Sequence, residues 1–269
     1  MRTRFGDRHD CDGCDRNAHF YRVKARRSYA CEYCGHQVYP TAGTPFDRTR
    51  TPLRDWFFVM FQFCASRNGV AAKEVERQLG VTYKTAWRMC HLIREYMGQV
   101  DGNAMIGGEG EIVEIDETLI GGRMPGSGHG NYRANKTVVL GMVERGGELV
   151  TAIVPNVKKE SLFPVIADTV MPGTIIHTDQ LNGYRALPSI GLSYGHASVN
   201  HNREEWARDN CHVQTIEGFW SQLKRGINGT HIHVSAKHLS KYLGEFEYRW
   251  NMRDQPHLMI DRLMVSFSR

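Results

Sequence analysis

The chain has 269 residues, 41% of them hydrophobic and 23% charged, which fits one sizeable core with one or two small modules and excludes a mainly disordered protein. No run reaches the roughly 18 consecutive apolar residues of a membrane span, and the charged N-terminus differs from an export signal, so we expect a cytoplasmic protein. The net charge of +5 is uneven, because residues 1–100 carry 17 Lys or Arg against 10 Asp or Glu and the remainder carries 17 against 19. The N-terminal part is therefore the part expected to meet phosphates.

The first forty residues contain two Cys-x2-Cys pairs whose spacing is typical of a zinc ribbon. The pairs are Cys11 with Cys14 and Cys31 with Cys34, and 16 residues separate them. Four thiolates at this spacing can surround one tetrahedral Zn²⁺ at about 2.3 Å each. We therefore expect a zinc ribbon with one structural Zn²⁺ over residues 1–40, with two unrelated cysteine pairs as the alternative.

Between the two pairs, apolar or aromatic residues alternate with basic ones over residues 19–30, as in a half-exposed β-hairpin. This alternation predicts that Arg22, Lys24 and Arg26 share one face. That face could lie on a DNA backbone, although zinc ribbons also contact other proteins.

Residues 50–100 are predicted to form a helical region with a helix-turn-helix, a common DNA-binding unit. A helix over 72–79, a turn at Gly80, and Thr82 as the N-cap of a helix over 83–97 fit this pattern. The inward stripe of the second helix is expected to be Ala86, Cys90, Ile93 and Met97. Lys84 and Arg88 are the outward residues expected to contact DNA.

After residue 108 the pattern changes to short β-branched runs separated by turns, which predicts an α/β fold with a mixed sheet and helices on its faces. The expected elements are strands over 111–120, 136–143, 149–154 and 174–178, and a helix over 159–170.

Acidic residues stand on two of these strands, where ionised groups are unfavourable unless a positive charge compensates them. Glu114 and Asp116 share one face of an apolar strand, and Asp179 directly follows another apolar run. Carboxylates at adjoining strand ends can bind two Mg²⁺ ions, and a metal would compensate their charge. A strand-end cap or a salt bridge is the alternative for either Asp alone. His177 would support the ligands from the same strand face.

A third carboxylate lies on a predicted helix that begins near His212. Glu217 and Lys224 are seven residues apart, which is two turns along one helix face, and Gln214 lies one turn earlier. A carboxylate for metal and a lysine for phosphate would then face one site. A surface ion pair is a poor alternative, because the two side chains are too far apart to pair directly.

The order Asp116, Asp179 and Glu217, with Lys224 seven residues later, resembles the DDE transposases of bacterial insertion sequences, in particular the family with an N-terminal zinc ribbon. The resemblance spans nearly the whole chain and rests on the motifs at 114–118, 178–185, 215–226 and 238–253. It implies an RNase H-like catalytic domain over residues 108–269. It also implies two Mg²⁺ ions, for which Mn²⁺ can substitute, and strand cleavage and transfer at the ends of the element.

The resemblance further implies roles for single residues. Asp116, Asp179 and Glu217 would hold the two Mg²⁺ ions, and Lys224 and Arg225 would hold the DNA. Some family members use Asn near the third position, so Gln214 remains the alternate ligand to Glu217. The implied partners are double-stranded DNA, both terminal repeats and target DNA, bound by a homo-oligomer at the bacterial nucleoid with no membrane involved.

Two other functions fit the same modules. A DNA-binding regulator could keep an inactive nuclease-like domain as a scaffold, although it would not need the carboxylates together with Lys224. A structure-selective nuclease on the same fold would cut branched DNA that carries no terminal repeat.

Overall fold

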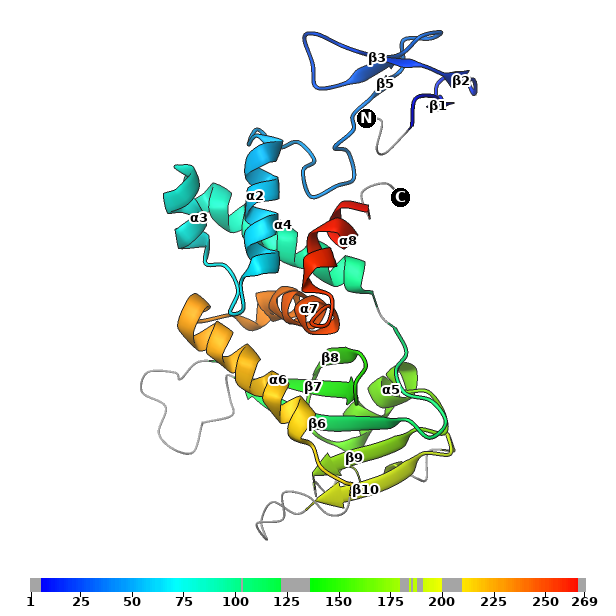
Figure 1. Cartoon of the computed structure of the whole chain (residues 1–269), viewed down its shortest axis with the longest axis vertical. Helices are drawn as coiled ribbons and strands as arrows, with labels where there is room; N and C mark the ends of the chain where they lie inside the picture. The colour runs from blue at the N-terminus through cyan, green and yellow to red at the C-terminus, as the bar shows by residue number, and fades with distance from the viewer. Residues whose placement is uncertain are drawn as a thin grey trace. The chain divides into compact units, whose positions relative to one another are not determined.

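The computed structural model describes residues 6–102, 104–121, 136–179, 184, 186–187, 191–199 and 210–265 (Figure 1). The chain divides into two compact units, which are Met1–Cys64 with His257–Arg269, and Ala65–Pro256. Residues 180–183 and 185, which belong to the predicted motif at 178–185, lie outside the described residues.

In its described residues, the first unit contains short antiparallel strands, two α-helices and one short 3-10 helix. One hairpin and one three-stranded sheet make up the ribbon that carries the four cysteines. The elements are β1 (His9–Asp10), β2 (Asn17–Ala18), β3 (Phe20–Arg22), β4 (Tyr29–Cys31), β5 (Gln37–Val38), α2 (Leu53–Ala65), η5 (Pro256–Leu258) and α8 (Met259–Val265).

The β3–β4 hairpin confirms the hairpin predicted between the two cysteine pairs, since these strands pair antiparallel. Strand β3 ends at Arg22, however, and Lys24 and Arg26 lie in the turn that follows it. The prediction that the three basic residues share one face is therefore wrong, because a two-residue period requires strand geometry. All three residues are exposed.

Helices α3 (Ala72–Leu79) and α4 (Tyr83–Asp101) belong to the second unit and are bounded by the predicted caps. Gly80 ends α3 in the left-handed conformation with φ of 64°. The Thr82 hydroxyl accepts a hydrogen bond from the backbone N–H of Thr85 at 3.4 Å, which makes Thr82 the N-cap of α4. The predicted inward stripe of α4 is buried, namely Ala86, Cys90, Ile93 and Met97. The helix pair is thus confirmed, and its DNA-binding role stays a prediction.

Helix α4 packs closely along α7 (Ala236–Asn251) in the same unit. The backbones approach at two glycines, since a Cβ on Gly244 would lie 2.9 Å from the Cα of Gly98. Beside this contact, Arg94 Nε donates to Glu245 Oε2 at 2.7 Å, with both side chains buried. Breaking a buried pair of this kind typically costs about 3–5 kcal/mol. Helix α4 is therefore anchored to α7.

The sheet of the second unit has five strands in the order β10-β9-β6-β7-β8. Strands β6, β7 and β8 are antiparallel neighbours, and β9 and β10 run parallel to β6. The elements are β6 (Ile112–Ile120), β7 (Thr137–Glu144), β8 (Leu149–Val154), α5 (Lys159–Thr169), β9 (Ile175–Asp179), β10 (Gly195–Val199), α6 (Gln214–Arg225) and η4 (Gly226–His231). The predicted strands and the helix over 159–170 agree within one residue at each end, whereas α6 begins two residues after His212 and β10 was not predicted. The α/β class and the RNase H-like arrangement are confirmed.

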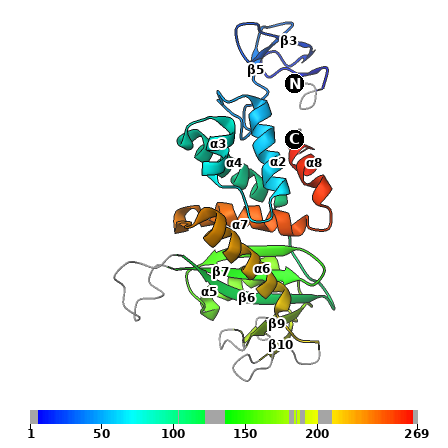
Figure 2. The same cartoon turned by 60° about the vertical axis from the view of Figure 1, so that its left-hand side comes forward.

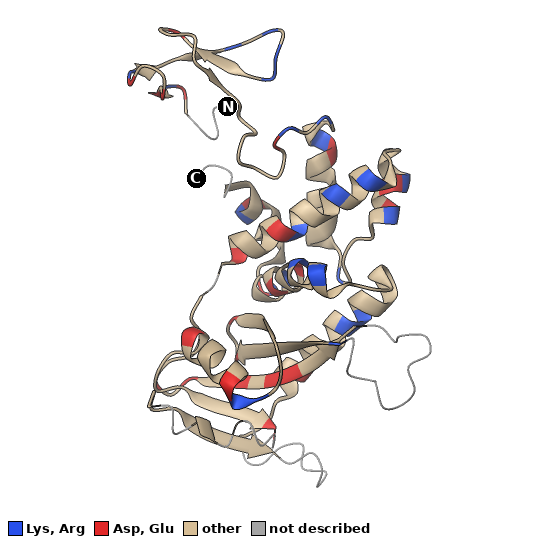
Figure 3. Cartoon of the chain, turned by 180° about the vertical axis from the view of Figure 1, so that it is seen from behind, with Lys and Arg blue, Asp and Glu red and all other residues tan. Residues whose placement is uncertain are grey.

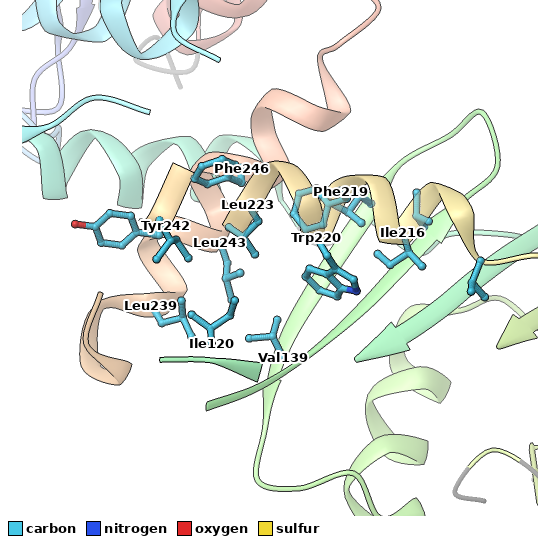
Figure 4. Close-up of a cluster of buried hydrophobic side chains, with 14 of the residues drawn as sticks. Ile120, Val139, Ile216, Phe219, Trp220, Leu223, Leu239, Tyr242, Leu243 and Phe246 are labelled. Atoms are coloured by element: carbon cyan, nitrogen blue, oxygen red, sulfur yellow. The ribbon is translucent and has the colours of Figure 1, made fainter. Parts of the chain in front are cut away.

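Two hydrophobic clusters cover the two faces of this sheet. Helices α6 and α7 lie on one face (Figure 2), where Trp220 of α6 lies toward Val139 of β7 and Phe219 belongs to the same buried cluster (Figure 4). Helix α5 lies on the other face, where Leu162 packs with Leu140. Among the described helices, none combines the length and the apolar character that crossing a bilayer would require.

Candidate active site

Asp116 and Asp179 lie side by side on the neighbouring strands β6 and β9. The two strands pair parallel with Ile115 opposite Thr178, so the next residue on each strand continues the same register. Neighbouring strands are about 4.8 Å apart. Figure 3 shows acidic positions in red along β6 and at the tip of β9. The sheet therefore brings together two predicted site residues that are far apart in the sequence.

Asp116 faces α6, where the indole N–H of Trp220 donates to Asp116 Oδ2 at 3.0 Å. Gly141, the partner of Asp116 on β7, leaves room for the indole, because a Cβ there would lie 2.5 Å from Trp220 Cζ2. Burial, together with the negative charges of Glu117 and Asp179, raises the pKa of Asp116 to about 7. A bound cation would reverse this shift, because it would favour the ionised carboxylate.

Glu114 lies two residues before Asp116 on the same strand face, and its side chain is completely buried. Arg145 Nε donates to Glu114 Oε1 at 2.8 Å, and the backbone N–H groups of Thr215 and Ile216 donate to Oε2 at 2.8 and 3.2 Å. These two N–H groups lie in the first turn of α6, whose N-cap residue Val213 has no side-chain acceptor. A carboxylate on the sheet therefore caps the helix, where a negative charge also suits the helix dipole.

This arrangement corrects one expectation from the sequence. We expected a metal to compensate the charges of both Glu114 and Asp116. The structure instead compensates Glu114 with the Arg145 guanidinium and with the N-terminus of α6. Of the two carboxylates on this face, Asp116 is the one suited to a metal.

Arg145, in the turn after β7, connects several segments around Glu114. Its guanidinium donates to the backbone oxygens of Asn210 and His212 at 2.8 and 3.1 Å. It also lies 3.2 Å from Nδ1 of His177, the residue expected to support the metal ligands. Burial and the charge of Arg145 lower the pKa of His177. His177 thus joins the network that holds the start of α6.

Helix α6 carries the remaining predicted site residues. Glu217 lies in its first turn, and Lys224 and Arg225 lie in its last turn, with all three exposed. Gln214, the alternate ligand, is the first residue of the helix and is also exposed. At about 1.5 Å per residue, Glu217 and Lys224 are about 10 Å apart along the axis. Trp220 lies about one turn after Glu217, so the contact of Trp220 with Asp116 brings this part of α6 over β6.

Glu117 and Tyr184 were missed by the sequence analysis. The Tyr184 hydroxyl donates to Glu117 Oε2 at 2.6 Å. Burial raises the pKa of Glu117, and burial together with the charge of Glu117 raises that of Tyr184 well above its ordinary value. Adjacency to Asp116 was a signal for Glu117, and Tyr184 lies within the motif at 178–185.

The four cysteines of the ribbon fit a metal closely. Their Sγ atoms all lie within 4.8 Å of one another. The Sγ–Sγ distance is 3.5 Å between Cys11 and Cys34 and 3.9 Å between Cys14 and Cys31. A tetrahedron with bonds of about 2.3 Å has edges of about 3.8 Å. The backbone N–H of Gly13 points to Cys11 Sγ at 3.4 Å, which stabilises the thiolate that a metal requires. The cluster therefore has the size and chemistry of a zinc site.

Among the described residues, the carboxylate oxygens of Asp116, Asp179 and Glu217 do not lie close enough together to form one ligand cluster, as the four cysteine sulfurs do. A two-ion site does not need one, because two metals about 3.5–4 Å apart can share one carboxylate and be held separately by the others. Of the three residues, Asp116 and Asp179 are the pair that the sheet brings together.

The residues predicted to contact DNA all lie at the surface. Lys84 and Arg88 are exposed on the N-terminal half of α4, next to the exposed rings of Tyr83 and Trp87. Arg22, Lys24 and Arg26 are exposed in the ribbon. The chain therefore presents basic residues in both of its units.

Residues 107–251, more than half of the chain, match the family model of the ISXO2-like transposase domain. A protein in the transposable element ISH50 of Halobacterium salinarum is 24% identical over 252 residues, which cover 88% of this chain and 82% of that protein. A transposase-like protein of Haemophilus influenzae is 32% identical over 107 residues, which cover 39% of this chain and 81% of that protein. The solved structure of a pre-cleavage Mos1 transpososome aligns over 83% of this chain and 82% of that chain, with 12% identity and a TM-score of 0.32, which is too low to bear on fold or function.

Proposed function

The chain belongs to the ISXO2-like transposase domain family, and on that premise we propose that it is a DNA transposase that cleaves and joins strands at the ends of a bacterial insertion sequence. The observation that carries the proposal is the parallel pairing of β6 with β9. This pairing sets Asp116 beside Asp179 on the sheet face that α6, the helix of Glu217, covers.

Asp116, Asp179 and Glu217 would hold two Mg²⁺ ions, with Mn²⁺ as a substitute and Gln214 as the alternative third ligand. The bound ions would supply Lewis acidity at the scissile phosphate and would activate the attacking water or 3′-hydroxyl. The chain itself supplies position. Trp220 orients the Asp116 carboxylate, and Glu114 fixes the start of the helix that bears Glu217.

Basic residues of both units would bind double-stranded DNA. Lys224 and Arg225 would bind phosphates of the element's end, because they lie on the helix of Glu217. The other proposed contacts are Lys84 and Arg88 of α4, and Arg22, Lys24 and Arg26 of the ribbon. The terminal repeats and the target DNA are the proposed partners. Because both ends of the element must be cut, we expect a homo-oligomer to act on the DNA.

The four cysteines would bind one structural Zn²⁺. We expect one zinc per chain by elemental analysis of the purified full-length protein, and loss of that zinc in Cys31→Ser. Cys90→Ser, which changes a buried cysteine of α4, is the control and should retain the metal. Full zinc content in Cys31→Ser would contradict the assignment.

The test of the function is a strand-cleavage assay. The full-length protein is incubated with a labelled duplex that carries the terminal repeat of its own element, with Mg²⁺ or with Ca²⁺ in its place. We expect nicked and joined products with Mg²⁺, and none from a duplex of scrambled sequence.

The other outcomes separate the alternatives. Specific binding without nicking would favour a DNA-binding regulator with an inactive nuclease-like domain. Cleavage of a four-way junction that exceeds cleavage of the terminal repeat, with no joined product, would favour a structure-selective nuclease.

A further inference from the structure

A pocket of about 270 Å³ lies at the C-terminal end of α6. The end of β6, the residue before β7, the last turn of α6 and the chain that follows α6 form its walls. Lys136 and Lys224 line it together with Asn228 and His233, and no acidic residue stands among the described residues that line it. The pocket therefore favours an anionic group.

The chain after α6 gives this pocket an apolar side. Helix α6 continues into the π-helical segment η4, a geometry that is frequent at functional sites. Gly226 lets this segment press against α7, since a Cβ there would lie 2.3 Å from Phe246 Cζ. Ile227 is buried at the pocket wall. The pocket thus combines a charged rim with an apolar wall.

Ile232 at the pocket is unusual in two independent respects. It has φ of 64°, in the left-handed region that β-branched residues avoid. Its side chain is also 82% exposed, although it is a large aliphatic residue. Neither feature stabilises the fold, and backbone strain of this kind clusters at functional sites. An apolar ligand surface that packs on Ile232 would account for its exposure.

The pocket lies within reach of a strand held near Glu217. Lys224 follows Glu217 by seven residues, or about 10 Å along α6. That length corresponds to about three nucleotides of duplex DNA along its axis. A strand that is held near Glu217 and runs along α6 would therefore reach the pocket within a few nucleotides.

We propose that this pocket binds one unpaired nucleotide of a DNA strand. The ammonium groups of Lys136 and Lys224 bind its phosphate, and its base packs on Ile227 and Ile232. The volume suits one nucleotide. A base leaves its partner to enter such a pocket, at the cost of a few kcal/mol for a base taken from intact duplex, so an unpaired nucleotide is the favoured occupant. That the bound strand is the end of an insertion sequence rests on the proposed function. That the pocket binds an unpaired nucleotide does not rest on it.

The test is photocrosslinking with a single 4-thiothymidine in a short oligonucleotide, followed by mass spectrometry of the crosslinked peptide. The full-length Asp116→Asn variant serves as the host, because it should not cut the probe and needs no chelator that would strip the ribbon. One probe carries the thiobase unpaired in a bulge, and the second carries it paired in a duplex. We expect the bulged probe to crosslink within the pocket residues 119–121, 136 and 224–234 and the paired probe to do so at least about tenfold less.

Two pairs of variants separate this pocket from general attraction to DNA. Lys136→Ala should reduce the crosslink about tenfold, whereas Lys159→Ala, an equal charge change at the start of α5 on the other face of the sheet, should not. Ile232→Ala should reduce it severalfold, whereas Ile153→Ala, at another exposed isoleucine, should not. Inorganic phosphate at millimolar concentration should compete weakly, because it lacks a base.

Three results would overturn the proposal. They are a crosslink that maps outside the pocket residues 119–121, 136 and 224–234, equal crosslinking of the bulged and paired probes, and equal effects of Lys136→Ala and Lys159→Ala. Full competition by phosphate would reassign the pocket to a simple anion. If the wild-type protein fails to cleave terminal-repeat DNA while the bulged probe still crosslinks, the proposed function fails and the pocket stands.

Discussion

Glu114 and Asp116 lie two residues apart on the same face of β6, and their surroundings are opposite. Glu114 is surrounded by donors, namely a guanidinium and the first N–H groups of α6. Asp116 receives the indole N–H of Trp220 and lies near the negative charges of Glu117 and Asp179. The comparison teaches that one strand can carry a carboxylate whose charge the fold compensates and another whose ionised form burial and neighbouring charges disfavour.

The largest effect is expected at Asp116. Asp116→Asn should reduce Mg²⁺-dependent cleavage at least about 10³-fold, or about 4 kcal/mol of transition-state stabilisation. Its melting temperature should be unchanged or higher, because the amide is buried without an ionised group. Cleavage assays and thermal unfolding measure the two. Retained cleavage would remove Asp116 from the active site.

The matched change at Glu114 should act on stability. Glu114→Gln is expected to lower the free energy of unfolding by about 3 kcal/mol, because it leaves Arg145 without its buried partner and weakens the cap of α6. Chemical denaturation measures this loss. If Asp116→Asn proves as destabilising as Glu114→Gln, the contrast between the two carboxylates is wrong.

A smaller effect is expected from the glycine opposite Asp116. Gly141→Ala would bring a Cβ to 2.5 Å from Trp220 Cζ2, so the indole must move from its position beside Asp116. We expect a loss of about 2 kcal/mol in unfolding free energy from overpacking, together with slower cleavage. Gly218→Ala, where a Cβ would meet open space on α6, is the control. It should be neutral or slightly stabilising, and equal stabilities of the two variants would show that the indole is not constrained.

The smallest effect concerns Glu247, a third carboxylate, which accepts a hydrogen bond from the backbone N–H of Thr151 at 2.6 Å. Burial raises the pKa of Glu247 to about 7, so the folded state favours its protonated form. Folding stability from this group is present below the ordinary pKa of a glutamate and is lost as the pH rises to about 7.

Glu247→Gln abolishes this titration while keeping an acceptor for Thr151. Relative to the wild type, the variant should therefore gain about 1 kcal/mol between pH 4.5 and pH 5.5. Unfolding at the two pH values measures the gain. A stability difference that does not change with pH would show that burial of Glu247 does not perturb it.

The elements that sequence reasoning found correctly depend on local patterns. The caps Gly80 and Thr82, the inward stripe of α4 and the strands that bear Asp116 and Asp179 all follow from residues close together in the chain. To predict that the two aspartates lie close together, we needed only that their strands be neighbours in the sheet. The sequence predicted a mixed sheet from three successive strands, a helix and a further strand, and the structure shows that β6 and β9 are neighbours in it.

What sequence reasoning missed depends on contacts between distant residues. Arg145 meets Glu114 across 31 residues, and Trp220 meets Asp116 across 104. Sequence periodicity does not reveal such pairs. We therefore expected a metal to compensate the charge of Glu114, which the Arg145 guanidinium compensates instead. The basic turn of the ribbon was misread for a related reason, because alternation continued in the sequence after the strand had ended at Arg22. The roles of single residues could therefore be assigned only from the fold, even where the helices and strands themselves could be predicted from the sequence.

The glycine contact between α4 and α7 fixes the position of one helix along the other. Gly98 and Gly244 leave no space for a side chain between the two backbones, so α4 cannot slide along α7 without losing the contact. Helix α4 and the strand of Asp116 belong to one compact unit, whereas the ribbon belongs to the other. If α4 binds the terminal repeat, this contact fixes the number of base pairs between the recognised sequence and the cleavage site. That number then does not depend on the length of the segment that leads from the ribbon.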